Sequence, residues 1–216
     1  DLDFSKIEET AILKSILSRK SIRKFLNNPI SKELLTLLLA ASQSAPSKSN
    51  LQQYSILVIQ DQNIKNEISD LIGNTKWALT APIFLLYLAD IRRNIKITND
   101  RGYDHKNNNV DTFMNSVIDA ALAMQSTICA AESIGLGVCP ISMIRNIIEE
   151  VKVICELPKG VFPIAGLTIG WPDQKSKISI RLSQDIVTHL NKYNENDLIH
   201  KTVSYTHLTL PTMFEV

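Results

Sequence analysis

The amino-acid sequence predicts one α+β domain in which helices are more abundant than strands. The chain has 216 residues, a length that allows a single domain with a sizeable core. Helical and strand-like segments alternate along it, without an internal repeat or a low-complexity linker. Three short segments rich in apolar residues, 54–59, 82–89 and 161–170, are the expected strands. The middle one is apolar throughout, which predicts burial on both faces.

Amphipathic periodicity and end signals predict the shorter helices. The first covers about residues 8–18. A second begins after Ser31, a favourable N-cap, and ends before Pro46, because the residue preceding a proline is disfavoured in helical geometry. Asp61 is the expected N-cap of a third helix, which ends at Gly73.

The longest periodic segment runs from about residue 110 to 134. A helix of about 25 residues spans about 37 Å, more than the radius of a small domain. We therefore expect either a central core helix or a helix at a subunit interface. Another helix follows from about residue 142 to 155. The apolar positions of the long helix recur at spacings of three and four: Val110, Phe113, Val117, Ala121, Met124, Ile128 and Ala131.

Composition excludes several classes of protein. A net charge of +1 and an aromatic content of 6% argue against a protein that grips nucleic acid. The four histidines are scattered singly, so no zinc pattern is present. No apolar run reaches the length of a membrane span, and the first residues lack the pattern of a signal peptide. Three widely spaced cysteines, without a CxxC pair, indicate a reducing compartment, and we expect a cytoplasmic protein.

A basic stretch after the first helix predicts an anion site. Arg19, Lys20, Ser21 and Arg23 could together hold a phosphate monoester, which carries close to two negative charges at neutral pH. Guanidinium groups bind such an oxyanion in a bidentate way. Charge alone also allows a second interpretation, a solvated basic patch that the dipole of the helix favours. A polar turn at 45–53, directly after an apolar helix, is the other polar feature.

Other possible sites are weaker. The stretch 135–140 is half of a GxGxxG motif, but its third glycine is missing and it follows a helix. Cys139 has no convincing histidine partner, so we interpret it as a structural thiol. Asp119 and Glu132 lie on different faces of the long helix, and we interpret them as capping or surface charges rather than as an acid/base pair.

Four motifs in order resemble signatures of the nitroreductase family. The first is the Arg-Lys-Ser-Ile-Arg-x-Phe sequence of 19–25, followed by Pro-Ile-Ser at 29–31 and by Ala-Pro-Ser at 45–47. The others occupy 130–141, 166–172 and 181–182. Their order and spacing best match the branch of NADPH-dependent nitroreductases and NADPH:flavin oxidoreductases. The resemblance covers about residues 7–200.

The resemblance implies a nitroreductase-like fold: a central, mostly antiparallel sheet flanked by helices, with the long helix at the interface of a homodimer. It implies FMN as cofactor and NADPH or NADH as reductant. The activity expected is reduction of nitroaromatics, quinones or flavins by ping-pong hydride transfer. The alternative that stays open is a flavin-binding or C-terminally truncated remnant protein without turnover.

The resemblance also implies roles for individual residues. Arg19, Lys20, Ser21, Arg23 and Arg181 would hold the phosphate or the edge of the flavin ring. The other predicted site residues would contact the flavin from three further segments of the chain: Ser47, Lys48, Ser49, Gln52, Thr75, Pro140, Ile141 and Ser142. No side chain is expected to be catalytic in itself, because the chemistry belongs to the flavin.

The end of the chain differs in character from the rest. Residues 203–216 alternate threonine with leucine and lack the Lys, Asn and Ile bias of the preceding sequence. This segment resembles a translated sequencing adapter, and the other interpretation is a genuine terminal segment. We therefore expect an FMN-binding domain over 1–202 and an atypical tail over 203–216.

Overall fold

The structure is a computed structural model that describes residues 10–73, 81–106 and 108–194. The chain forms two compact units, residues 1–177 and 178–216. All elements below belong to the first unit except the short helix α8 (Gln184–Val187). The domain boundary expected at 202/203 lies outside the described residues.

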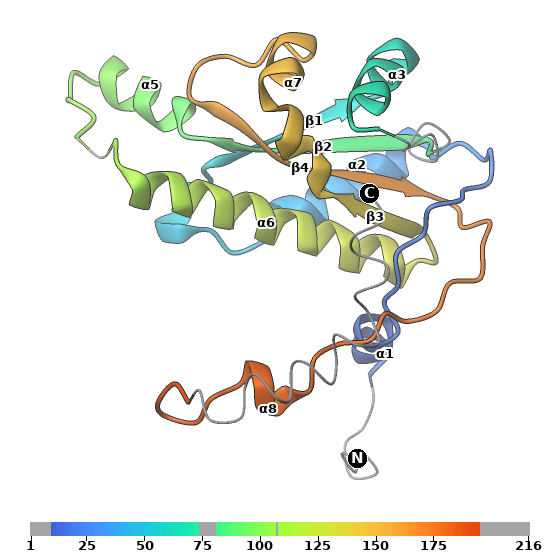
Figure 1. The fold of residues 1–216 in the computed structure, drawn as a ribbon. Helices are drawn as coiled ribbons and strands as arrows, with labels where there is room; N and C mark the ends of the chain where they lie inside the picture. Colours follow the sequence, from blue (N-terminus) through green and yellow to red (C-terminus); the bar gives the residue numbers. More distant parts are fainter. Residues whose placement is uncertain (1–9, 74–80, 107, 195–216) are drawn as a thin grey trace. The chain divides into compact units, whose positions relative to one another are not determined.

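The first unit is built on a four-stranded antiparallel sheet with the order β1-β2-β4-β3 (Figure 1). The strands are β1 (Tyr54–Ile59), β2 (Ile83–Asp90), β3 (Gly137–Ile141) and β4 (Val161–Gly170). Every residue of β2 is buried, as predicted for a strand covered on both faces. The α+β class and the antiparallel sheet are therefore confirmed.

Helices cover both faces of this sheet. α2 and α6 lie on one face, and α3 and α7 lie on the other (Figure 1). Each face has its own apolar core, one centred on Leu85, Tyr87 and Leu167 and the other on Leu86 and Ile144. The bounds are α1 (Ala11–Leu17), α2 (Lys32–Gln43), α3 (Gln62–Leu71), α5 (Arg92–Asp100), α6 (Val110–Ser133) and α7 (Ile148–Ile154).

The end signals of the helices act as predicted. The Ser31 hydroxyl accepts a hydrogen bond from the Leu34 amide at 3.1 Å, which caps α2. The Asp61 carboxylate accepts the Asn63 amide at 2.7 Å and so caps α3. Gly73 follows α3 with a φ of 67°, a left-handed conformation that favours glycine.

The face of α6 that packs on the sheet leaves out part of its apolar repeat. Val110 and Ala121 are exposed, and the face toward the sheet is made of small and polar residues: Thr112, Ser116, Asp119, Ala120, Ala123, Thr127, Ile128 and Ala131. Small side chains let the helix pack closely across all four strands. Hydrogen bonds satisfy the buried hydroxyls, such as the 2.7 Å bond that the Tyr87 hydroxyl donates to Thr127.

Two elements of the first unit are absent from the sequence-based expectation. Strand β3 is five residues long and begins at Gly137, so its composition lacks a clear strand signal. Helix α5 has only two apolar residues, Ile95 and Ile97, too few for the repeated apolar spacing by which the other helices were predicted. In place of one helix over 142–155, the chain forms a 3₁₀ helix (Ser142–Ile147) followed by α7.

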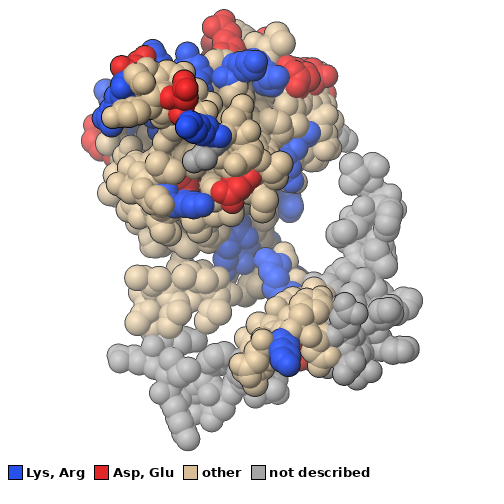
Figure 2. All heavy atoms as spheres, turned by 90° about the vertical axis from the view of Figure 1, so that its left-hand side faces the viewer, with Lys and Arg blue, Asp and Glu red and all other residues tan. Residues whose placement is uncertain are grey.

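Figure 2 shows basic and acidic side chains interspersed over one face, without a large field of one sign. This distribution agrees with the net charge of +1. The three cysteines are free. No helix within the described part of the chain combines the length and apolarity needed to cross a membrane.

Candidate functional site

The basic stretch 19–25 lies against the edge of the sheet. Ser21 forms a parallel bridge with Val138 of β3, and the Ile22 amide donates to the Val138 carbonyl at 2.9 Å. Ile22 and Phe25 are buried, with 4% and 6% of their surfaces exposed. These two apolar side chains fix the stretch to the core, while the polar residues between them stay at the surface.

Gly137 makes this close approach possible. A Cβ atom at this position would lie 2.8 Å from three side-chain atoms of Ile22, closer than real Cβ contacts. Only glycine therefore lets the basic stretch lie directly on β3. The glycine sets the position of the polar groups, although it presents no side chain to a ligand.

The cations of the stretch differ in their partners. The Arg19 side chain lies 3.7 Å from the Glu132 carboxylate, at the end of α6. Lys24 forms an ion pair with Asp173 at 2.8 Å. Lys20 and Arg23 are exposed, and the Arg23 amide donates to the side chain of Gln174. Charged groups thus remain accessible to an anion on this edge of the sheet.

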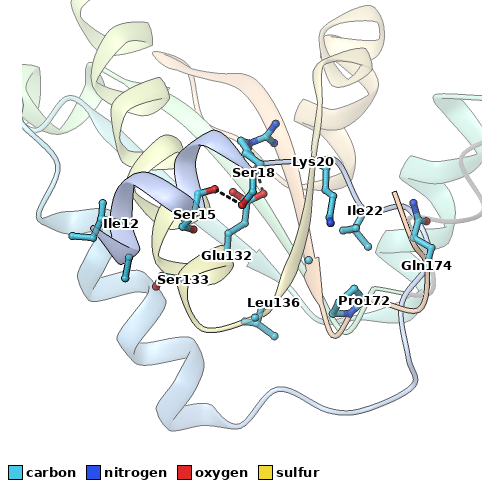
Figure 3. Close-up of a pocket in the computed structure, with 14 residues that line it drawn as sticks. Ile12, Ser15, Ser18, Lys20, Ile22, Glu132, Ser133, Leu136, Pro172 and Gln174 are labelled. Atoms are coloured by element: carbon cyan, nitrogen blue, oxygen red, sulfur yellow. Dashed lines mark hydrogen bonds and ion pairs between the residues drawn. The ribbon is translucent and has the colours of Figure 1, made fainter. Parts of the chain in front are cut away.

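A hollow of about 400 Å³ lies beside the stretch, and Arg19 and Lys20 line it. Ser21 and Arg23 are not among the residues that line it, whereas Ile22 is. Figure 3 shows two groups of side chains across this hollow, Lys20, Ile22, Pro172 and Gln174 facing Ser15, Ser18 and Glu132.

Ser21 and Arg23 interact instead with the thiol of Cys139. Burial raises the pKa of Cys139, and the positive charges of Arg23 and Arg19, with hydrogen bonds from Ser21 and Arg23, oppose that rise. The thiol is 2% exposed. This agrees with a structural role for the cysteine.

The polar turn predicted to contact the flavin begins at Ser47. Lys48, Ser49 and Gln52 are exposed, and a 3₁₀ helix covers Lys48–Asn50. The Ser47 hydroxyl accepts the Gln52 amide at 2.8 Å. The turn therefore presents several polar side chains on a closely hydrogen-bonded main chain.

The third predicted segment follows β3. Pro140 is half-buried and Ser142 is exposed at the start of the 3₁₀ helix. The Ile141 side chain, 3% exposed, packs in the core, so any contact with a ligand falls to its main chain. Among the described residues, no group of three His, Cys, Asp or Glu side chains is placed to hold a metal ion.

The two remaining predicted residues, Thr75 and Arg181, belong to none of these sequence segments. Thr75 lies outside the described residues. Arg181 belongs to the second unit, where its guanidinium lies 3.3 Å from the carbonyl oxygens of Ser179 and Ile180. Their predicted contacts with the cofactor stay predictions.

Within one chain, the basic stretch and the polar turn lie far apart along α6. Arg19 contacts Glu132 near one end of this helix, and the Lys48 ammonium lies 3.5 Å from Asp111 at the other end. At about 1.5 Å per residue, these contacts are about 30 Å apart. The main chain of the turn is nearer, because the Lys48 and Gln53 amides bind Asp119, about 20 Å along the helix from Glu132.

The interpretation of Asp119 as a surface charge is wrong. Its carboxylate is 1% exposed and accepts hydrogen bonds from the polar turn. Sequence periodicity could not reveal this contact, because the two segments are about 70 residues apart in the chain. Glu132 is the ion-pair partner of Arg19, which the spacing along α6 also did not indicate.

Comparisons with known proteins agree with this fold. The model of the nitroreductase family matches residues 16–171. An FMN reductase [NAD(P)H] of Bacillus subtilis is 37% identical over 90% of this chain and 79% of its own. An oxygen-insensitive NADPH nitroreductase of Salmonella typhimurium is 34% identical over 84% of this chain and 74% of its own. The solved NADPH:FMN oxidoreductase of Vibrio harveyi, complexed with NAD+, is 29% identical, with a TM-score of 0.86 over 94% of this chain and 86% of its own.

These likenesses over most of the chain define its class, an NAD(P)H-dependent oxidoreductase. Within that class, the chain belongs to the nitroreductase family, in the branch of NADPH:FMN oxidoreductases and nitroreductases. The resemblance found in the sequence motifs is thereby confirmed.

Proposed function

We propose that this protein binds FMN and uses NADPH or NADH to reduce a nitroaromatic, a quinone or a free flavin. Bound FMN would supply the hydride chemistry, accepting a hydride from the reductant and passing it to the acceptor. The protein would bind the phosphate, orient the ring and admit both substrates in turn to the same space. Ping-pong kinetics follow from that shared space.

The observation that carries this proposal is the basic stretch on β3. Lys20 and Arg23 are exposed, Ser21 adds a hydroxyl, and Gly137 provides a close approach that any other residue would block. Lys20 lines the hollow and Ser21 and Arg23 do not, so one side of the stretch would hold the phosphate monoester and the other the edge of the flavin ring. A positive charge near the flavin ring would also stabilise its reduced, anionic form, a role we assign to Arg23 or Lys20.

The distance between the two predicted halves of the site supports assembly of two copies. One chain separates the basic stretch from the main chain of the polar turn by about 20 Å along α6, from Glu132 to Asp119. In a homodimer with α6 at the interface, the turn of one copy can complete the phosphate site of the other. Each FMN would then contact both subunits.

Exposed apolar residues on α6 support the same arrangement. Val110, Met114, Ile118 and Leu122 recur every fourth residue, with between 38% and 73% of their surfaces exposed. Residues at this spacing lie on one face of a helix. A continuous apolar face at the surface is typical of an interface.

Replacement of Ile118 by aspartate tests this interface. We expect the Kd of self-association to rise at least about 100-fold, or about 3 kcal/mol, because the variant would bury an unpaired charge. Sedimentation equilibrium measures the change. Val153→Asp is the matched control, since Val153 is also exposed on a helix, at 78%. Equal association of the Ile118→Asp variant and the native chain would contradict the proposed interface.

The test of the activity is direct. The protein is purified without added flavin, its visible spectrum is recorded, and any released chromophore is identified. NADPH consumption is then followed with a nitroaromatic, a quinone and free FMN as acceptors. We expect bound FMN and turnover of at least one acceptor.

The outcomes separate the two functions considered. FMN binding with NADPH-dependent turnover supports the oxidoreductase. FMN binding without turnover of any acceptor would favour a flavin-binding protein instead. A protein that neither carries FMN nor binds it when it is added would refute the proposal.

A further inference from the structure

The buried carboxylate of Asp119 is the centre of the polar turn. Its Oδ2 atom accepts the Ser47 hydroxyl at 2.7 Å and the Gln53 amide at 3.0 Å, and its Oδ1 atom accepts the Lys48 amide at 3.1 Å. The turn therefore closes around one acceptor group that projects from the middle of α6. Hydrogen bonds to a charged acceptor are stronger than neutral ones, and burial increases that difference.

These hydrogen bonds act on a main chain that needs outside support. Ser49, Asn50 and Gln52 all have left-handed conformations, with φ between 49° and 54°. Residues with a side chain rarely adopt this conformation, and the stretch 45–53 contains no glycine. Such conformations persist where the surroundings hold them in place.

The residues held in this way include those predicted to meet the flavin. Ser49 and Gln52 are exposed between the two places where the turn is attached, Lys48 and Gln53. The Gln52 amide donates to the Ser47 hydroxyl, which donates to Asp119. The position of Gln52 is thus linked to the carboxylate through one intervening hydroxyl.

We propose that Asp119 is the positioning residue of the flavin-contacting turn, and that it sets the affinity for FMN without touching the cofactor. This inference rests on the proposed function, since it requires that the turn meets FMN. It assigns to α6 a second role besides that of interface helix. The helix holds the turn from the inside by a single side chain.

The variant Asp119→Asn keeps the volume of the side chain and removes part of its accepting capacity. All three partners of Asp119 are donors. In one orientation the new NH₂ group faces the Lys48 amide, and in the other it faces the Ser47 hydroxyl and the Gln53 amide. Either orientation places donors against donors, so at least part of the turn must detach.

Thr127→Val is the matched control. Thr127 is also buried on the sheet-facing side of α6, and it accepts the Tyr87 hydroxyl at 2.7 Å, away from the turn. The substitution removes two buried hydrogen bonds, the one from the Tyr87 hydroxyl and the one that Thr127 donates to the Ala123 carbonyl, with little change in shape. It reports the general loss of stability that a change inside α6 causes.

The experiment compares the native chain, Asp119→Asn, Ser47→Ala and Thr127→Val. For each, the melting temperature, the Kd for FMN, the visible spectrum of bound FMN and hydrogen exchange of the Lys48 and Gln53 amides are measured. We expect Asp119→Asn to raise the Kd about tenfold or more, to shift the flavin spectrum and to speed exchange in the turn. Ser47→Ala should do so less strongly. Thr127→Val should lower the melting temperature and leave the Kd and the spectrum unchanged.

The results that overturn the inference differ from those that refute the proposed function. If the native chain binds FMN and the Asp119→Asn variant binds it equally well with the same spectrum, Asp119 does not position the turn. Unchanged amide exchange in Asp119→Asn overturns the inference with or without flavin. If Asp119→Asn does not fold, an unaltered Kd for FMN in Ser47→Ala overturns the inference. Failure of the native chain to bind FMN refutes the proposed function, and the inference falls with it.

Discussion

The double variant Lys20→Ala/Arg23→Ala is expected to raise the Kd for FMN by roughly 100-fold, equivalent to about 3 kcal/mol. Each charged hydrogen bond contributes about 1.5–3 kcal/mol, so two contribute about 3–6 kcal/mol, and the exposure of both side chains places the sum at the lower end of this doubled range. Titration of the apoprotein with FMN, followed by quenching of flavin fluorescence, measures the change. The reduction potential of the flavin that still binds should also fall, because a nearby positive charge stabilises the reduced anion.

Lys24→Ala is the control for this prediction. Lys24 belongs to the same stretch, but its ammonium pairs with Asp173 at 2.8 Å. We expect little change in the Kd for FMN on its removal. The single variants of Lys20 and Arg23 show which side of the stretch faces the phosphate, since Lys20 lines the hollow and Arg23 approaches Cys139. An unchanged affinity and potential in the double variant would remove both residues from the proposed role.

Gly137→Val is expected to lower the free energy of unfolding by about 2–3 kcal/mol and to weaken FMN binding strongly. A Cβ atom here already conflicts with Ile22 at 2.8 Å, and valine adds two further methyl groups. Overpacking of this kind costs about 1–3 kcal/mol. The basic stretch must move away from β3, and Ser21 and Arg23 move with it. Urea unfolding and FMN titration measure the two effects.

The direction of this effect is informative, because intrinsic strand propensity favours valine over glycine. A stabilised Gly137→Val variant would show that the close approach to Ile22 is unimportant. The variant Ile22→Ala removes the contacting branches of the isoleucine side chain. Combined with Gly137→Val, it should restore part of the lost stability and affinity, in a double-mutant cycle with favourable coupling.

The main elements of the fold could be predicted from local sequence. Strand β2 is a continuous apolar run, α2 and α3 begin at side chains that cap them, and α6 has the length and periodicity of a long helix. In each case the determining interactions lie within a few residues of one another. Local patterns therefore carry enough information to place these elements.

The groups proposed to bind an anion could also be located from the sequence, but their arrangement could not. The order of residues in the stretch 19–25 indicated a phosphate site. Its attachment to β3 depends on pairing with Val138, more than 100 residues away. Strand β3 itself has little intrinsic strand character, and pairing with β4 on one side and Ser21 on the other makes it a strand.

The long helix also shows the difference between what local sequence predicts and what tertiary contacts decide. Periodicity placed Val110 and Ala121 in the apolar repeat and left open whether a core or a subunit interface covers it. Close packing against the sheet selected small residues such as Ala120 and Ala123. Asp119 lies on that buried face and holds a turn that is about 70 residues distant in the chain.

By itself, the sequence determined most helices of the first unit, three of its four described strands and the family, and it indicated the groups proposed to bind an anion, because these depend on local preferences and on motif order. Only the tertiary structure decided which face of α6 is buried, which glycine admits the basic stretch and which carboxylate holds the polar turn. Those features depend on contacts between distant segments, and their geometry exists only once the chain is packed.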